Sequence, residues 1–177
     1  ASDDAAIASL AMSTLAAQSR FIQSQRRMEL PLGELPAELF HALTARAAAQ
    51  AEDAAARAGV AQLLADYDEA ASRIGLLARL VAAMRRGALA ARALDHAGLA
   101  LFASALAAQT DLVRSAAVLA CHEGQGARLA LALRAAGAAL PVIERQFLLV
   151  EPAAHMPRAI AALSPERAGL LLGAGGA

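Results

Sequence analysis

Lysine, asparagine and tryptophan do not occur in this 177-residue chain, and cysteine and tyrosine occur once each. With no lysine and only four histidines, the chain offers few groups that could act as a base, a nucleophile or a metal ligand. One tyrosine and four phenylalanines leave little aromatic surface on which nucleic-acid bases could stack. These absences argue against an ordinary enzyme and against a nucleic-acid-binding protein. We therefore predict a non-enzymatic chain with no cofactor and no resident metal.

An excess of one charge is also missing, because 16 arginines balance 16 acidic residues. A neutral chain has no net field that would draw it to nucleic acid or to an anionic membrane. The longest runs without a charged residue, 5–19 and 96–110, are shorter than the roughly 18–20 residues that cross a bilayer. The lone Cys121 cannot form an internal disulfide, which is typical of a reducing compartment. We predict a cytoplasmic protein with no membrane span.

Alanine and leucine dominate what is present, with 53 and 29 copies. Both residues enter a helix at low cost in free energy, and strand-favouring residues are scarce. The composition predicts an all-α protein: a single compact domain of about 7–9 helices over residues 1–172. Two or three long helices (1–86) should precede short stacked helical hairpins (87–172), and residues 173–177 should form a flexible tail.

Caps, prolines and glycines predict where the helices begin and end. Ser2 or Asp3 can cap a first helix that runs towards Met28, and the two prolines at 31 and 36 forbid its continuation. A second helix is expected over 36–57 with Gly59 as its stop, followed by one long periodic helix over 60–86. Shorter helices are expected at 88–96, 99–109, 111–122, 125–136, 140–150, 157–163 and 164–172. Gly75, inside the long helix, predicts the close approach of another helix, and the alternative is a flexing point.

Histidines are the first candidates for chemistry, because phosphotransfer and acid–base reactions use them. A phosphoacceptor histidine needs an exposed helical position with cations near it. His41 has Arg46 five residues later, and His96 follows Arg92 by one helical turn. The alternative for both histidines is a capping or partly buried structural role.

A metal site is the other possibility that the sequence raises, at Cys121-His122-Glu123. Adjacent residues on a helix point about 100° apart, so these three cannot converge on one ion without unwinding. The position of His122 near a helix C-terminus has another explanation, because the helix dipole stabilises a positively charged side chain there. The sequence does not favour a metal centre there.

Four phrases between Leu77 and Pro152 carry a family resemblance. They are residues 80–87 (LVAAMRRG), 92–102 (RALDHAGLALF), 127–137 (ARLALALRAAG) and 143–149 (IERQFLL). In this order they resemble a helical family of alphaproteobacteria known as domain of unknown function 2336. The resemblance implies an all-helical fold and a longer parent protein, and it brings no catalytic residues with it.

Three functions remain open after these considerations. The leading hypothesis is a non-catalytic helical interaction module that can pair with its own copy through the first helix, at Ile7, Leu10 and Phe21. The second is a signalling or phosphorelay accessory with His41 or His96 as acceptor. The third is a carrier of a small apolar ligand, with a pocket lined by Phe102 and Phe147. The sequence identifies neither the partner nor the ligand.

Overall fold

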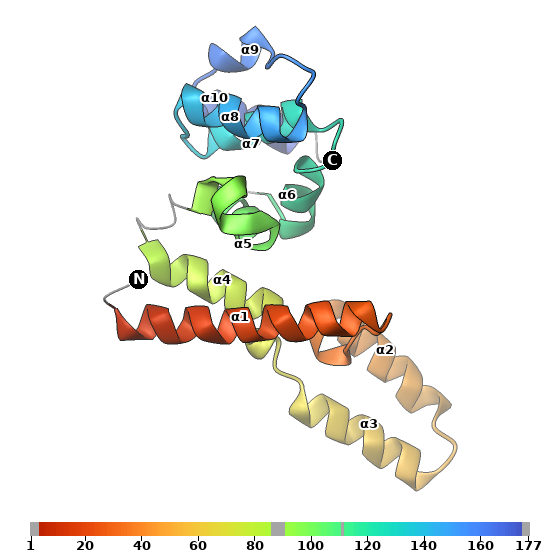
Figure 1. The fold of residues 1–177 in the computed structure, drawn as a ribbon. Helices are drawn as coiled ribbons and strands as arrows, with labels where there is room; N and C mark the ends of the chain where they lie inside the picture. Colours follow the sequence, from red (N-terminus) through yellow and green to blue (C-terminus); the bar gives the residue numbers. More distant parts are fainter. Residues whose placement is uncertain (1–3, 86–90, 111, 175–177) are drawn as a thin grey trace. The chain divides into compact units, whose positions relative to one another are not determined.

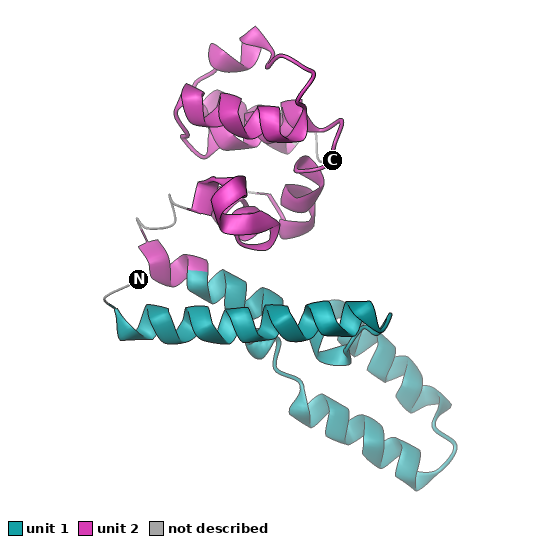
Figure 2. Cartoon of the chain, in the orientation of Figure 1, with its two compact units in different colours: residues 1–80 teal, residues 81–177 magenta. Residues whose placement is uncertain are grey.

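All regular structure in the computed structural model, which describes residues 4–85, 91–110 and 112–174, is helical (Figure 1). Ten α-helices and two short 3₁₀ turns make up this part of the chain, which confirms the predicted all-α class. No helix in these ranges is long and apolar enough to cross a membrane. The chain divides into two compact units, residues 1–80 and 81–177 (Figure 2). The predicted boundary between the long-helix part and the short-helix part lies after residue 86, six residues later.

Helix α1 (Ala5–Arg26) begins at Asp4, whose Oδ1 accepts the backbone N–H of Ala6 at 2.9 Å. The predicted caps at positions 2 and 3 lie outside the described residues. The helix ends at Arg26, because Met28 adopts a left-handed φ of 59°. The N–H of Glu29 then returns to the Ser24 carbonyl at 2.9 Å, the hydrogen-bond pattern of a Schellman C-cap. The predicted end at Met28 is therefore close to the observed one.

The proline segment breaks the chain as predicted and contains the 3₁₀ turn η1 (Leu32–Glu34). Helix α2 (Ala37–Gln50) follows Pro36, but it ends seven residues before the predicted end at Arg57. Asp53 starts α3 (Ala54–Asp66) instead, with its Oδ1 accepting the Ala56 N–H at 2.7 Å. Gly59, the predicted stop, lies inside α3, where a glycine costs only about 1 kcal/mol.

The prediction of one continuous helix over residues 60–86 is wrong. Helix α3 ends at Asp66, and the 3₁₀ turn η2 (Glu69–Ala71) separates it from α4 (Arg73–Met84). Asp68 accepts the N–H of Ala70 at 2.9 Å, and Ser72 accepts the N–H of Gly75 at 3.1 Å. These short side chains offer the backbone local alternatives to helical hydrogen bonds, so the chain turns here.

Gly75 lies against this turn. A Cβ atom at Gly75 would sit 2.2 Å from the carbonyl oxygen of Glu69 and 2.8 Å from the Cα of Ala70. A segment does approach Gly75 closely, but it is the 3₁₀ turn η2 before the same helix and not the predicted neighbouring helix.

The described part of unit 2 contains α5 (Leu94–Gln109), α6 (Arg114–Ala120), α7 (Gly126–Ala135), α8 (Leu140–Val150), α9 (Arg158–Ala161) and α10 (Pro165–Ala174). Helix α5 runs through the break that the sequence predicted between residues 96 and 99. Glycines with φ between 72° and 82° mark a kink inside α5 at Gly98 and the turns at Gly124 and Gly137. The observed bounds of α8 match the predicted range 140–150. The predicted helix at 88–96 falls partly outside the described residues. Of the predicted tail, residues 173 and 174 belong to α10, and 175–177 are not described.

The core of unit 2 forms around α7, which packs against α8 and α10, while α5 packs against α6. Its largest fully buried side chains are Phe102, Leu106, Leu129, Leu133, Ile143 and Gln146. Gln146 is polar, but its Oε1 accepts the backbone N–H of Leu94 at 2.8 Å and so satisfies a donor at the start of α5. The last turn of α4 adds Val81, which packs with Ala91 and Ala105.

Candidate interaction surfaces

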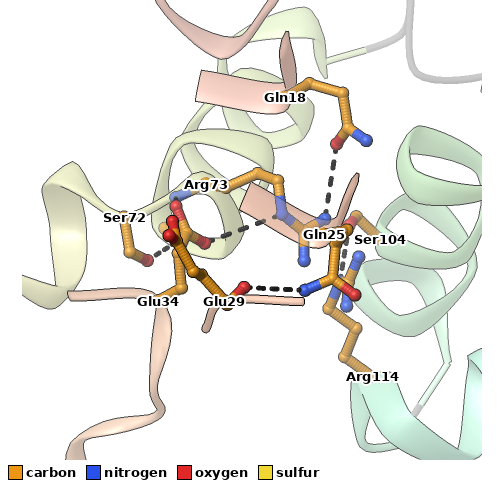
Figure 3. A network of polar contacts seen from close by, with 9 residues as sticks. Gln18, Gln25, Glu29, Glu34, Ser72, Arg73, Ser104 and Arg114 are labelled. Atoms are coloured by element: carbon orange, nitrogen blue, oxygen red, sulfur yellow. Dashed lines mark hydrogen bonds and ion pairs between the residues drawn. The ribbon is translucent and has the colours of Figure 1, made fainter. Parts of the chain in front are cut away.

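Arg73 organises the polar interior of unit 1 (Figure 3). Its Nε lies 3.6 Å from Glu34 Oε2, and the two side chains are only 11% and 15% exposed. Its Nη1 donates to Gln18 Oε1 at 3.4 Å, and its guanidinium lies 4.1 Å above the ring of Phe21. Neither Arg73 Nε nor Glu34 Oε2 has a hydrogen bond besides this ion pair. The cluster therefore links α1, η1 and α4.

Tyr67 stacks on Phe40 at the base of the α2–α3 hairpin, with ring centroids 3.9 Å apart and planes 9° apart. Its hydroxyl donates to the Leu35 carbonyl at 2.8 Å, and burial together with the Glu69 charge raises its pKa above the usual value. Glu69 Oε1 accepts the N–H of Ala37, which caps the first turn of α2. These contacts hold the start of α2 against the end of α3.

His41, the first predicted phosphoacceptor, lies beside this aromatic pair. Its ring meets those of Phe40 and Tyr67 edge-on, with centroids 5.7 Å and 5.8 Å away. His41 and Arg46 are both exposed, and the support that Arg46 would give His41 stays a prediction. The surroundings of His41 are those of an aromatic packing partner.

Helices α2 and α3 run side by side in opposite directions as a hairpin (Figure 1). Only Phe40 and Thr44 of α2 are buried, and the Thr44 hydroxyl is satisfied by the Phe40 carbonyl at 2.9 Å. No residue of the 13-residue α3 is buried. Four leucines of the hairpin stay exposed, at positions Leu39, Leu43, Leu63 and Leu64. The hairpin thus presents apolar side chains for which unit 1 supplies no cover.

The predicted pairing residues of α1 are directed into the protein's own interior. Ile7, Leu10 and Phe21 are half-buried, on the same side as the buried Thr14 and Ala17. The large apolar side chains that α1 exposes are different ones, Met12, Leu15 and Ile22. Helical spacing divides the apolar residues of α1 between two faces, but it does not select the face that is buried.

His96, the second predicted phosphoacceptor, is exposed at the start of α5 in unit 2. Its Nε2 lies 3.4 Å from Arg145 Nη2 on α8 and 3.5 Å from Asp95 Oδ2. Arg145 also forms an ion pair with Asp95. Partial burial raises the pKa of the Asp95 carboxyl, but the hydrogen bond and the positive charge of Arg145 outweigh it and hold that pKa below the usual value. The predicted cation, Arg92, is engaged with Gln109 instead. A cation does stand beside His96, but it comes from a helix that sequence spacing could not relate to it.

The three residues at 121–123 do not converge. Cys121 follows the end of α6 and donates its thiol to the Ala117 carbonyl at 3.3 Å, while His122 Nδ1 lies 2.8 Å from the Glu123 backbone carbonyl. Burial raises the pKa of Cys121 to about 11, so the thiol form is favoured. Among the described residues, no group of three His, Cys, Asp or Glu side chains is arranged to hold a metal ion.

Three shallow grooves lie on unit 2, with volumes of about 460, 420 and 440 Å³. Phe147 lines the third of them beside His155 and Met156. Phe102, the other residue predicted to line a ligand pocket, is fully buried in the core and borders none of the three. The two phenylalanines therefore do not form a common pocket in this part of the molecule.

Comparison with known protein families, with curated proteins and with solved structures finds no match for this chain. The resemblance to domain of unknown function 2336 stays a prediction.

Proposed function

We propose that this protein is a non-catalytic helical interaction module whose binding part is unit 1. The observation that carries the proposal is the α2–α3 hairpin, in which no side chain of the 13-residue α3 is fully buried. The proposed partner is a protein that presents an apolar helix face to the exposed leucines of the hairpin.

Energetic considerations support an uncovered surface at the hairpin. An isolated helix shorter than roughly 12–15 residues is marginal in water, and most helical stability comes from packing an apolar face. Unit 1 has few buried apolar side chains to supply that packing: Ala17, Phe40, Leu76, Leu77 and Leu80. Each leucine that a partner covered fully would add about 1.5–3 kcal/mol relative to its exposed state.

Capture experiments with matched variants test the proposal. The whole chain, immobilised, is offered to a lysate of its native host, in parallel with Leu43→Glu and Leu63→Glu variants. We expect a protein that the wild type retains and both variants lose, because a buried carboxylate without a partner opposes docking. The retained protein is then purified, and its affinity for each variant is measured by calorimetry.

A charge on unit 2 provides the control, since Leu170 is at least as exposed as either hairpin leucine. The Leu170→Glu variant should retain the same protein with unchanged affinity. Equal retention by the hairpin variants and the wild type would contradict the proposal, provided that circular dichroism shows all variants folded.

His96 supports a second candidate function, as a phosphoacceptor. The specific observation is Arg145, whose guanidinium lies 3.4 Å from the exposed ring and could hold a phosphoryl oxygen. Incubation with the small phosphodonor phosphoramidate should then phosphorylate the wild type at an acid-labile site. The His96→Ala variant should lose that modification, while the His41→Ala and His155→Ala variants keep it. Phosphorylation that is unchanged in His96→Ala would rule this candidate out.

A further inference from the structure

Helix α1 carries two separate stripes of residues spaced at alternating steps of three and four. One is the half-buried and buried side that lies within unit 1: Ile7, Leu10, Thr14, Ala17, Phe21 and Ser24. The other is made entirely of exposed residues: Ala8, Met12, Leu15, Ser19, Ile22 and Arg26. At 100° per residue the two stripes are centred about 150° apart, nearly on opposite faces of the helix. We call the second one the outer seam.

The outer seam has the spacing of a coiled-coil contact line, which repeats every 3.5 residues over more than two heptads. Its three large side chains are exposed to 67%, 60% and 44% at Met12, Leu15 and Ile22. Scattered surface leucines need no explanation, but three large apolar side chains at heptad spacing on one exposed helix face indicate a helix partner.

The order of residues along the outer seam is symmetric about Ala17, since its positions lie two, five and nine residues on either side. A second α1 can therefore run in the opposite direction, related by a two-fold axis that crosses the outer seam at the height of residue 17. The two outer seams then meet in register. Met12 then lies opposite Ile22, Leu15 opposite Ser19, and the small Ala8 opposite the long Arg26 of the second copy. Large side chains face smaller or flexible ones at each level, as close packing requires.

Charge also favours the opposite direction. Asp4 caps the N-terminus of α1, and no acidic residue lies between positions 5 and 26. Arg20 and Arg26 lie in the C-terminal third of the helix. Parallel helices would place the arginines of the two copies side by side, which is repulsive. Antiparallel helices bring Arg26 of one copy near Asp4 of the other. They also place the partly positive N-terminus of each helix beside the partly negative C-terminus of the other.

From this complementarity of spacing and charge, we propose that the outer seam of α1 binds the outer seam of a second copy in antiparallel orientation. This inference rests on the proposed function, because it takes unit 1 as the part that binds. The partner that it names is a second copy of the same chain. The contact involves three large side chains per copy, so its area is below that of a standard interface, and we expect a micromolar equilibrium between monomer and dimer.

Sedimentation equilibrium of the whole chain tests self-association. The weight-average mass of the wild type should rise from monomer to dimer with concentration, and the Leu15→Glu variant should remain monomeric over the same range, a loss of at least tenfold in affinity. Ser13→Glu adds the same charge to an exposed position of the same helix outside the outer seam. This control should dimerise like the wild type.

Disulfide trapping tests the orientation, in a Cys121→Ser background. Antiparallel seams place position 15 opposite position 19, so a mixture of Leu15→Cys and Ser19→Cys proteins should cross-link faster than either protein alone. Faster cross-linking of Leu15→Cys with itself would indicate parallel helices and overturn the proposal.

The remaining outcomes separate this inference from the proposed function. A wild type that stays monomeric, or a dimer that Leu15→Glu leaves intact, overturns the outer-seam contact. Neither result affects capture of a different protein by the hairpin, which the Leu43→Glu and Leu63→Glu variants test independently.

Discussion

At the level of single residues, two glycines let backbone segments approach more closely than a side chain would allow. Gly75 lies against the turn η2, and Gly126 lies against α8, where an added Cβ would be 2.4 Å from Glu151 Cγ and 2.9 Å from the Phe147 ring. Gly59 and Gly169 lie in helices with open space around them. Glycine is thus required for packing at some positions and only tolerated at others.

Replacement of glycine by alanine should therefore have opposite effects at two positions of unit 1. Gly75→Ala should lower the free energy of unfolding by about 1–3 kcal/mol, because the Glu69 carbonyl must move to admit the methyl group. Gly59→Ala should raise it by roughly 0.5–1 kcal/mol, since alanine is the better helix former and nothing lies near. Urea denaturation followed by circular dichroism measures both. A Gly75→Ala variant as stable as the wild type would mean that the turn does not press on α4.

The partly buried thiol of Cys121 should give a pH-dependent reactivity. Burial raises its pKa from 9.0 to about 11, so the thiolate fraction at pH 8 should be roughly 100-fold smaller than in the unfolded chain. Iodoacetamide should modify the folded protein slowly at pH 8 and faster as the pH approaches 11, with urea-unfolded protein as the control. By linkage, the stability that the neutral thiol contributes is fully present below about pH 9 and is lost as the pH rises through about 11. Equal alkylation rates for folded and unfolded protein at pH 8 would refute this.

At the level of helices and turns, unit 1 is held together by polar and aromatic contacts between segments far apart in the sequence. Arg73 of α4 reaches Gln18 of α1, and its backbone N–H donates to Glu34 Oε1 at 3.4 Å. Tyr67 and Glu69 fasten the chain before α4 to the start of α2. A buried ion pair adds specificity more than stability, because desolvation of both charges opposes their attraction.

Removal of one charge from the buried pair should therefore cost more than removal of both. We expect Glu34→Met to lower the free energy of unfolding by about 2–3 kcal/mol, because it leaves Arg73 buried without its counterion. The double variant Glu34→Met/Arg73→Met should recover most of that loss. Arg79→Met on the exposed side of α4 serves as the control and should change stability by less than about 0.5 kcal/mol. The expectation fails if the double variant is the least stable protein of the series in chemical denaturation.

At the level of the whole molecule, the two units differ in how they are stabilised. Unit 2 contains the continuous apolar cluster around α7, including Phe102, Leu129, Ile143 and Phe147. Unit 1 buries few apolar side chains and leaves many large ones exposed on α1, α2 and α3. A unit with a small core depends more on partners for its stability, which agrees with the function proposed for it.

Hydrogen exchange should report this difference directly. At concentrations low enough to keep the protein monomeric, amides of α3 should exchange fastest and those of α7 and α8 slowest, with a separation greater than about tenfold. Mass spectrometry of peptic fragments measures the rates for each helix. Raising the protein concentration should slow exchange in α1 if the outer seams associate, while α10 remains unchanged as an internal control. Protection of α3 equal to that of α7 would contradict the view that the hairpin lacks its own core.

Much of the helical architecture follows from local sequence. Alanine and leucine establish the all-α class, the prolines at 31 and 36 separate α1 from α2, and Gly124 and Gly137 mark two turns. Gly98 lies between the helices predicted at 88–96 and 99–109, but α5 continues through it with a kink. These features depend on hydrogen bonds and φ angles within about four residues, which the local sequence controls directly. The bounds of α8 could be predicted for the same reason.

Tertiary contacts decided the rest. The chain turns between α3 and α4 where Tyr67 stacks on Phe40 and Glu69 caps α2, and neither partner can be recognised from residues near position 67. Arg145 reaches His96 from 49 residues away. Which stripe of α1 faces inward also depends on Arg73 and its neighbours, because periodicity alone permits either face. Periodicity makes α1 a helix with two usable faces, and packing against a distant segment selects the one that is buried.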